Sequence, residues 1–327
     1  MKEIEYIYAV SFVRTLENKM LEKSDFEAIL NLSSVEETMQ YLFNKGYGSS
    51  IHSNTEQNIN AETLLKEELA YTWKEVKGAC PRGAPLDILL YQNDFHNLKA
   101  ILKAVFSDKP YEHLVLEPFT IPPEVIHRAI ANGDPEILPD ILRKPGSEAY
   151  QILARDKDGQ LAEIVLDKAL FNAMNAIARQ SENKFLIGLV DLNITITDMK
   201  IALRGAHSGK NKAFLLSAMM GKRINVDHLA DAAAQDVSTV IQVFAQNGFE
   251  EAARAAQESL SVFEKWCDNE LIRYLRTVRY KSFGVEPIIS FLLIKQFELK
   301  ALRIVLSGIK RRVPARILRE RLRDLYV

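Results

Sequence analysis

Apolar residues recur along this chain at the three- and four-residue spacings of an amphipathic helix. In residues 161–179, Leu166, Leu170, Ala173 and Ile177 follow one another at spacings of four, three and four, which places them on one helical face. The same periodicity covers six further segments, residues 4–22, 34–43, 61–77, 224–246, 251–278 and 285–307. No segment alternates apolar and polar residues over the length of a strand. The pattern therefore predicts an all-α fold.

Polar residues mark where several of these helices begin. Ser24 or Asp25 can cap a helix over the residues that follow, and Asp227 can cap another. The run 33–37 places two serines three residues before two glutamates, which is the spacing of a capping box. The connections that contain Gly and Pro are short, namely residues 46–48, 80–85, 110–123 and 156–159. Short connections favour a compact body over independent domains joined by linkers.

One seven-residue pattern occurs three times. Residues 97–103, 198–204 and 301–307 share an apolar residue, a basic residue, two variable residues and a leucine, and the copies lie 101 and 103 residues apart. Similar openings follow at 121–126, 224–229 and 313–318. We therefore expect three similar helical units at 1–120, 121–223 and 224–327, with 313–327 closing the first. This repetition predicts a pseudo-threefold body with a central hollow, and linear stacking of the units stays open.

Composition narrows the class of protein. The chain has 327 residues, is 47% apolar and 26% charged, and carries a formal net charge of −1, which excludes a disordered chain and a wholesale nucleic-acid binder. It has only 14 glycines and 11 prolines, as expected of long helices. Cys80 and Cys267 form no metal-binding pattern and suit a reducing cytosol. The start of the chain has no apolar signal region, and the longest apolar run, 287–294, is too short to cross a bilayer, so we expect a soluble protein.

Candidate catalytic patterns are weak. Residues 205–211 resemble a phosphate-binding loop, but only three residues separate the two glycines, Asn211 replaces the Ser or Thr that would bind Mg²⁺, and no strand is predicted before it. Residues 156–159 lack the ligands of a calcium loop. His96, beside Asn97, could orient a buried network. The other histidines are His52, His113, His127, His207 and His228, and none forms a zinc-binding pair. We expect no catalytic residue, cofactor or metal site.

Positive charge gathers at the end of the chain. Residues 295–327 contain ten Lys and Arg against three Asp and Glu, a local charge of +7, whereas the remainder carries −8. Lipid headgroups, acidic residues of a protein partner, or the chain's own acidic helices could neutralise this segment. Lys310, Arg311 and Arg312 fall in a predicted connector, where side chains are exposed. We hypothesise that these three residues contact a partner or the membrane surface.

Several segments resemble one family, the C subunit (also called d) of V-type and A-type rotary ATPases. They are residues 8–10, 13–17, 21 with 25–26, 47–48, 94–103, 283–293, 302–308 and 319–327. The last three of these are the most specific, and together the segments cover essentially the whole chain in the family's order. Three features depart from the family pattern. Ala301 stands where a polar Asn is common, residues 310–312 are unusually basic, and residues 191–204 are less typical.

The resemblance implies a non-catalytic rotor subunit. Members are funnel-shaped, all-helical bodies of three similar bundles, in which the hollow receives the central shaft and the base sits on the membrane proteolipid ring. The chain is then expected to couple rotation of the shaft to rotation of the ring, and thereby to proton or sodium movement. It would be cytoplasmic and peripheral to the membrane through the complex, without cofactors or nucleic acid. The alternative is a generic helical adaptor that binds a partner in a concave groove, and a helical enzyme ranks third.

Overall fold

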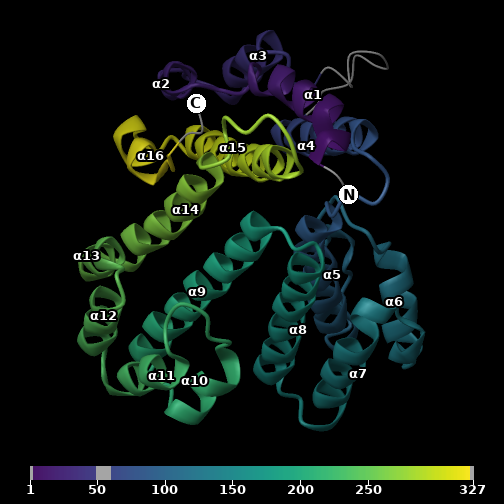
Figure 1. The fold of residues 1–327 in the computed structure, drawn as a ribbon, viewed down its shortest axis with the longest axis vertical. Helices are drawn as coiled ribbons and strands as arrows, with labels where there is room; N and C mark the ends of the chain where they lie inside the picture. Colours follow the sequence, from purple (N-terminus) through teal and green to yellow (C-terminus); the bar gives the residue numbers. More distant parts are fainter. Residues whose placement is uncertain (1–2, 49–59, 325–327) are drawn as a thin grey trace. The chain divides into compact units, whose positions relative to one another are not determined.

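A computed structural model describes residues 3–48 and 60–324, and every regular element in these residues is helical (Figure 1). The predicted all-α class is confirmed, since these residues contain no strand. By their contacts they divide into two compact units. The first combines the chain up to Leu86 with the chain from Glu264 onward, and the second is Asp87–Phe263. The division into three units at 1–120, 121–223 and 224–327 stays a prediction.

The first unit joins the two ends of the chain. Its N-terminal elements are the 3-10 helix η1 (Glu3–Tyr6) and the α-helices α1 (Ile7–Glu17), α2 (Lys23–Leu30), α3 (Val35–Asn44) and α4 (Ala61–Ala79). Its C-terminal elements are most of α14 (Leu260–Arg276), α15 (Glu286–Lys310) and α16 (Ala315–Arg321). The helix α15 contacts α1, α3, α4 and α16 and is therefore the centre of this unit.

The second unit is continuous in sequence. Its elements are α5 (Asp87–Phe106), η2 (Glu112–Leu114), α6 (Pro123–Ala131), η3 (Pro135–Ile137), α7 (Asp140–Arg155), α8 (Gly159–Gln180), α9 (Lys184–His207), α10 (Lys212–Ala218), α11 (Val226–Gln235), α12 (Val237–Gln246) and α13 (Glu250–Glu258). The helix α5 packs against α6, α7 and α8, while α9 packs against α8, α10, α11 and α12. Each of these two long helices is thus surrounded by its neighbours in sequence.

Apolar burial explains why the long helices look apolar on more than one face. In α15, Leu299, Leu302, Val305 and Leu306 belong to one cluster with side chains from α2, α3, α4 and α16. Gly308 lets α16 approach, because a Cβ there would collide with Leu318. The apolar character of α15 is therefore that of a core helix packed on several sides. No helix among the described residues is long and apolar enough to span a bilayer.

Two helices expected to be continuous are broken by capping residues. The predicted segment 224–246 is interrupted at Asp236, whose backbone is extended and whose Oδ1 accepts the N–H of Thr239 at 2.8 Å. The segment 251–278 is interrupted in the same way at Ser259, whose Oγ accepts the N–H of Val262 at 3.1 Å. Asp and Ser side chains compete with the helix for backbone donors, so each begins a new helix.

The remaining cap predictions were partly right. Ser34 caps α3, with its Oγ accepting the N–H of Glu37 at 3.1 Å, as the capping-box spacing predicts. The helix α2 begins one residue before the predicted capping residues, at a capping box between Glu22 and Asp25. Asn225, and not Asp227, caps α11. The predicted helix at 4–22 is shorter than expected, since α1 ends at Glu17 and α2 begins at Lys23.

Candidate functional site

The connector between α15 and α16 presents the three basic residues singled out in the sequence. Lys310 ends α15, Arg311 follows as its C-cap, and Arg312 adopts a positive φ of 55° that turns the chain. The turn closes where the N–H of Val313 donates to the carbonyl oxygen of Gly308 at 2.9 Å. All three basic side chains are exposed, and none forms an ion pair with a described residue. Their contact with a partner stays a prediction.

Other cations of the basic C-terminal segment are neutralised within the first unit. Five of them face carboxylates at 2.6–3.1 Å: Lys295 with Glu298 and Glu68, Lys300 and Arg323 with Asp268, Arg303 with Glu62, and Arg319 with Glu27. Internal pairing thus accounts for half of the ten cations. The exposed cations of this segment without an ion pair in residues 3–48 and 60–324 are Lys310, Arg311, Arg312, Arg316 and Arg321. We call these five the unpaired cations.

A buried polar network fixes α15 to the N-terminal helices. Lys295 Nζ lies 2.8 Å from Glu298 Oε1 and 3.1 Å from Glu68 Oε1, and it donates to the Tyr47 hydroxyl oxygen at 3.1 Å. The Tyr47 hydroxyl donates in turn to Glu298, and Glu298 Oε2 accepts the N–H of Leu21 at 2.7 Å. Each charged group in this cluster therefore has a partner, as a buried charge requires.

Burial and charge set the ionisation of this network. Burial alone would lower the pKa of Lys295, but the carboxylates of Glu298 and Glu68 raise it above its ordinary value. Burial, together with Glu298, raises the pKa of the Tyr47 hydroxyl well above its usual range. Lys295 is thus charged and Tyr47 neutral at physiological pH. The sequence prediction missed this network, although a Lys and a Glu three residues apart inside the apolar stretch of α15 are the signal that could have revealed it.

Buried polar residues on α5 hold the loop that leads into the next helix. Asp94 Oδ1 accepts the N–H groups of Thr120 and Ile121 at 2.9 and 3.1 Å, shortly before α6. Asn97 exchanges two hydrogen bonds with the backbone of Leu116. His96, which could have oriented a buried network, is only half-buried, and its Nε2 lies 3.1 Å from the Leu114 carbonyl oxygen in an exposed contact. The buried hydrogen bonds are made by Asp94 and Asn97 instead.

The equivalent position on α9 makes the same kind of contact. Asp198, which matches Asn97 in the repeated sequence, accepts the N–H groups of Met220 and Gly221 at 3.0 and 2.8 Å, shortly before α11. In the third copy, Ala301 occupies this position and has no polar group. Glu298, three residues earlier and matching Asp94, instead holds Leu21, just before α2. Each long helix therefore anchors the entry to a shorter one.

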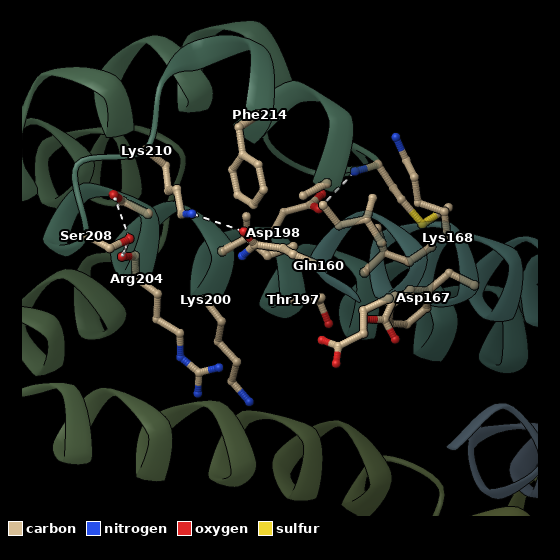
Figure 2. Close-up of a pocket in the computed structure, with 18 residues that line it drawn as sticks. Gln160, Asp167, Lys168, Thr197, Asp198, Lys200, Arg204, Ser208, Lys210 and Phe214 are labelled. Atoms are coloured by element: carbon tan, nitrogen blue, oxygen red, sulfur yellow. Dashed lines mark hydrogen bonds between the residues drawn. The ribbon is translucent and has the colours of Figure 1, made fainter. Parts of the chain in front are cut away.

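A cavity of about 380 Å³ lies among α8, α9 and α10 (Figure 2). Figure 2 shows Lys200 and Arg204 extending from α9 in the same direction, as expected four residues apart. The segment 205–211 borders this cavity. Its Lys210 Nζ donates to Gln160 at 3.1 Å, and its Asn211 caps α10 by accepting the N–H of Phe214 at 2.9 Å. These residues connect helices, and no strand precedes them in the described chain, so the arrangement is not that of a phosphate-binding loop.

The other weak motifs also have structural partners. Asp158, from the calcium-like segment 156–159, caps α8 by accepting the N–H of Leu161 at 2.9 Å. Cys80 is half-buried and Cys267 buried, and neither forms a disulfide in the described structure. His52 lies outside the described residues. No group of three or more His, Cys, Asp or Glu in the part of the chain that the structure describes is arranged to hold a metal ion.

Comparison with known proteins matches the chain over nearly its whole length. The family model described as "ATP synthase (C/AC39) subunit" matches residues 9–321. The C subunit of the V-type sodium ATPase of Enterococcus hirae is 21% identical over 99% of this chain and 99% of its own. The C subunit of the A-type ATP synthase of Thermococcus gammatolerans is 24% identical over 92% of this chain and 85% of its own. The C subunit of the V-type ATP synthase of Thermus thermophilus is 24% identical over 63% of this chain and 64% of its own.

The extent of these matches agrees with the all-helical fold and with the motifs at both ends of the chain. The family model runs from within α1 to the last residue of α16, so it covers both compact units. This chain therefore belongs to the ATP synthase C/AC39 subunit family, the V-type and A-type ATPase family that its sequence motifs resemble.

Proposed function

We propose that this chain is a non-catalytic central-stalk subunit of a V/A-type ATPase, and that it couples the central shaft to the membrane proteolipid ring. The observation that carries the proposal is the family match over residues 9–321, which leaves neither compact unit outside the family. In this role the chain transmits rotation during ATP-driven proton or sodium transport or ATP synthesis. It works at the cytoplasmic side, peripheral to the membrane through its partners.

We further propose three similar helical bundles around a central hollow, with the overall form of a funnel. The three long helices α5, α9 and α15 carry the three copies of the repeated pattern. Each also has a buried polar side chain that holds the segment before a shorter helix, at α6, α11 and α2. These shared contacts support units at 1–120, 121–223 and 224–327, with 313–327 completing the first. Superposition of the three bundles in an assembled complex tests this arrangement.

The contacts within each unit suit a part that carries torque. A coupling element has to resist twisting, and close-packed helices compress little. The buried Lys295 network ties α15 to segments more than 200 residues away, while Asp94 and Asp198 tie loops to their own bundles. Satisfied buried polar networks of this kind hold one arrangement of helices. A rotation applied to one surface of such a unit is transmitted to the opposite surface with little internal deformation.

Co-purification tests the proposed role. We expect the tagged chain to isolate with the shaft and proteolipid subunits from its native cell. Removing the chain from the complex should leave ATP hydrolysis by the catalytic head but abolish ATP-driven ion transport, because the two are no longer linked mechanically. The isolated chain should not turn over ATP. Robust ATP turnover by the purified chain, or ion transport that continues without it, would overturn the proposal.

The connector residues Lys310, Arg311 and Arg312 are proposed to contact an acidic partner or the membrane surface. They are adjacent, exposed and without an ion pair among the described residues, so they are available for such a contact. Changing all three to Glu should weaken assembly, and more strongly at low salt, where charges are less screened. The matched control reverses three exposed cations of the second unit, Lys144, Arg155 and Lys157. Unchanged assembly at low and high salt would remove this contact from the proposal.

A further inference from the structure

A positively charged groove of about 410 Å³ lies among α2, α14 and α16 in the first unit. Among the described residues that line it, five are cationic: Lys23, Lys265, Arg276, Arg319 and Arg323. The carboxylates that line the same groove among the described residues are those of Glu27 and Asp324. Its volume falls in the range of small-molecule sites, about 300–1,000 Å³. Neither the family assignment nor the proposed coupling role requires such a feature.

Part of this positive charge has no ion-pair partner among the described residues. Glu27 is engaged by Arg319 at 2.6 Å, and Arg323 is engaged by Asp268 at 2.9 Å. Lys265 Nζ donates to the carbonyl oxygen of Glu320 at 2.9 Å, which satisfies one of its donors but does not neutralise it. Lys23, Lys265 and Arg276 form no ion pair in residues 3–48 and 60–324. The groove therefore keeps a net positive charge, because its cations outnumber the carboxylates that line it.

Arg276 is the residue that points most clearly to a ligand. Its Nε is buried from solvent and has no hydrogen-bond partner in the described structure. Buried donors are almost always paired, because an unmade hydrogen bond is unfavourable. A guanidinium offers several N–H groups in a planar fork that matches an oxyanion. Arg276 lines the groove, so an oxyanion bound there can engage the guanidinium.

The number of cations in the groove indicates the charge of the anion. Lys265 and Arg276 lie on the same helix, eleven residues apart, which corresponds to about 16 Å along its axis. Both side chains are long and flexible, so their separation along the helix axis does not set the ligand's length; the three cations without an ion pair, Lys23, Lys265 and Arg276, instead favour an anion with several charges. A linear anion with several charges can reach from one to the other and neutralise three cations together.

We propose that the groove among α2, α14 and α16 binds a diphosphate or triphosphate group, with Arg276 and Lys265 engaging its two ends. The group can belong to an inorganic polyphosphate, a nucleotide or a phosphorylated lipid headgroup, since the groove recognises the same oxygens in each. Arg319 and Lys23 border the groove from the neighbouring helices and add to its positive potential. This inference concerns the isolated chain and does not depend on the coupling role.

Calorimetric titration of the purified full chain with pyrophosphate and with tripolyphosphate tests the site. At about 0.15 M salt, where the Debye length is about 8 Å, we expect one saturable site. Arg276→Gln and Lys265→Gln should each weaken binding about tenfold or more, since each removes a charge-assisted contact. Arg276→Lys should weaken binding less than Arg276→Gln, because it keeps the charge but loses the fork. Arg155→Gln, an exposed residue of the second unit, removes the same charge and should leave binding unchanged.

Further measurements distinguish a folding defect from a binding defect and show which kind of molecule supplies the phosphate groups. Far-UV dichroism should show that the variants fold, and Lys23→Gln, at an exposed position, provides a second test should Arg276→Gln not fold. Titration with ATP, and sedimentation with vesicles that contain a phosphoinositide, shows which source binds best. Three results overturn the proposal. The first is that neither polyphosphate shows saturable binding up to about 1 mM. The second is that Arg155→Gln weakens polyphosphate binding as much as Arg276→Gln does. The third is that the same residues bind a hexaglutamate peptide while the chain binds no polyphosphate.

Discussion

The two compact units stabilise their buried acidic residues in different ways. In the first unit, Asp25, Asp268 and Glu298 each face a Lys or Arg side chain at 2.6–2.9 Å. In the second unit, Asp94 and Asp198 accept backbone N–H groups and form no ion pair with a described residue. A carboxylate removed from water is thus stabilised by a cationic side chain in the first unit and by backbone N–H donors in the second.

The pKa values follow from this difference. Burial acts to raise the pKa of Asp268, but Lys300 and Arg323 bring it below its ordinary value. The pKa of Asp25 is lowered against burial in the same way, by Lys45 and Tyr41. In the second unit, burial raises the pKa of both Asp94 and Asp198, and their hydrogen bonds offset it only in part. At comparable burial, the two cations beside Asp268 thus hold a carboxylate in its charged form more effectively than the hydrogen bonds to Asp94 do.

The sequence separation of these contacts differs as well. The Lys295 network links residues 248 and 251 positions apart, and Glu298 reaches Leu21 over 277 positions. The contacts of Asp94 and Asp198 span only 22–27 positions. The first unit therefore depends on charged side chains to close a long chain loop, whereas the second uses polar side chains to shape local turns. Disrupting each kind of contact should have a different effect.

The largest effect is expected at Lys295. Changing Lys295→Met leaves Glu298 and Glu68 buried without a cation, and we expect the first unit to lose about 3–5 kcal/mol of stability. The two tryptophans, Trp73 and Trp266, both lie in this unit, so tryptophan fluorescence during denaturant unfolding reports on it selectively. Lys144→Met, at an exposed site in the second unit, is the control and should change stability by less than about 0.5 kcal/mol. A loss at Lys295 no larger than the control's would contradict the importance of the network.

The next effect is expected at Asp94. Removing its carboxylate in Asp94→Ala leaves the N–H groups of Thr120 and Ile121 without their acceptor, at an expected cost of about 1–3 kcal/mol. Asp94→Asn should cost less, because its amide oxygen still accepts a hydrogen bond. Hydrogen exchange should quicken at residues 116–121, while the tryptophan signal of the first unit keeps its midpoint. An equal loss of stability in Asp94→Ala and Asp94→Asn would mean that the negative charge of Asp94, and not its ability to accept hydrogen bonds, matters at this site.

Acidification should change the stability contribution of the buried carboxyl groups in opposite directions in the two units. Asp25 and Asp268 have lowered pKa values in the folded protein, so their stabilisation is present above the unfolded pKa of about 3.9 and is lost as pH falls through the folded value. Asp94 and Asp198 have raised values, so their contribution is full below about pH 3.9 and declines as pH rises through the folded value. Below about pH 4, tryptophan fluorescence should therefore report unfolding at a higher pH than hydrogen exchange in α5 and α9 does.

Substituting the acids isolates their share of this pH dependence. Asp268→Asn should flatten the acid limb of the tryptophan-detected curve, because the residue no longer takes up a proton. Asp198→Asn should leave that curve unchanged and alter only the second unit. If both units unfold together at every pH, or if Asp268→Asn keeps the full acid dependence, the contrast between the units fails.

The smallest effect is expected at an exposed ion pair of the first unit. Arg303 faces Glu62 at 3.1 Å, and both side chains are well exposed. We expect Arg303→Gln to cost about 0.2–1 kcal/mol, since solvent and salt screen such pairs. Comparing it with Lys295→Met in the same fluorescence assay measures how much burial adds to a cation's contribution. Similar losses in the two variants would show that pairing alone, without burial, determines the effect.

Some of these features could be predicted from the sequence and others could not. The helical periodicity correctly predicted α3, α4, α8 and α15 to within a few residues, because it depends on local spacing. It failed at Asp236 and Ser259, where a single side chain ends one helix and begins another without changing the apolar pattern. The exposure of Lys310, Arg311 and Arg312 was predicted from their place in a connector. The groove lined by Arg276 was missed, because its cations come from helices that are distant in sequence.

The sequence alone determined the helical class, the threefold recurrence of one pattern and the family, since each depends on residue order and spacing. Only the tertiary structure decided which cations meet which carboxylates. Of ten basic residues in the C-terminal segment, five are neutralised within the first unit and five, the unpaired cations, are exposed without an ion pair among the described residues. No local pattern distinguishes the two groups. The reason is physical: an ion pair forms where folding brings two side chains within about 4 Å, and that proximity depends on how α15 and the segment after it pack against α2, α4 and α14.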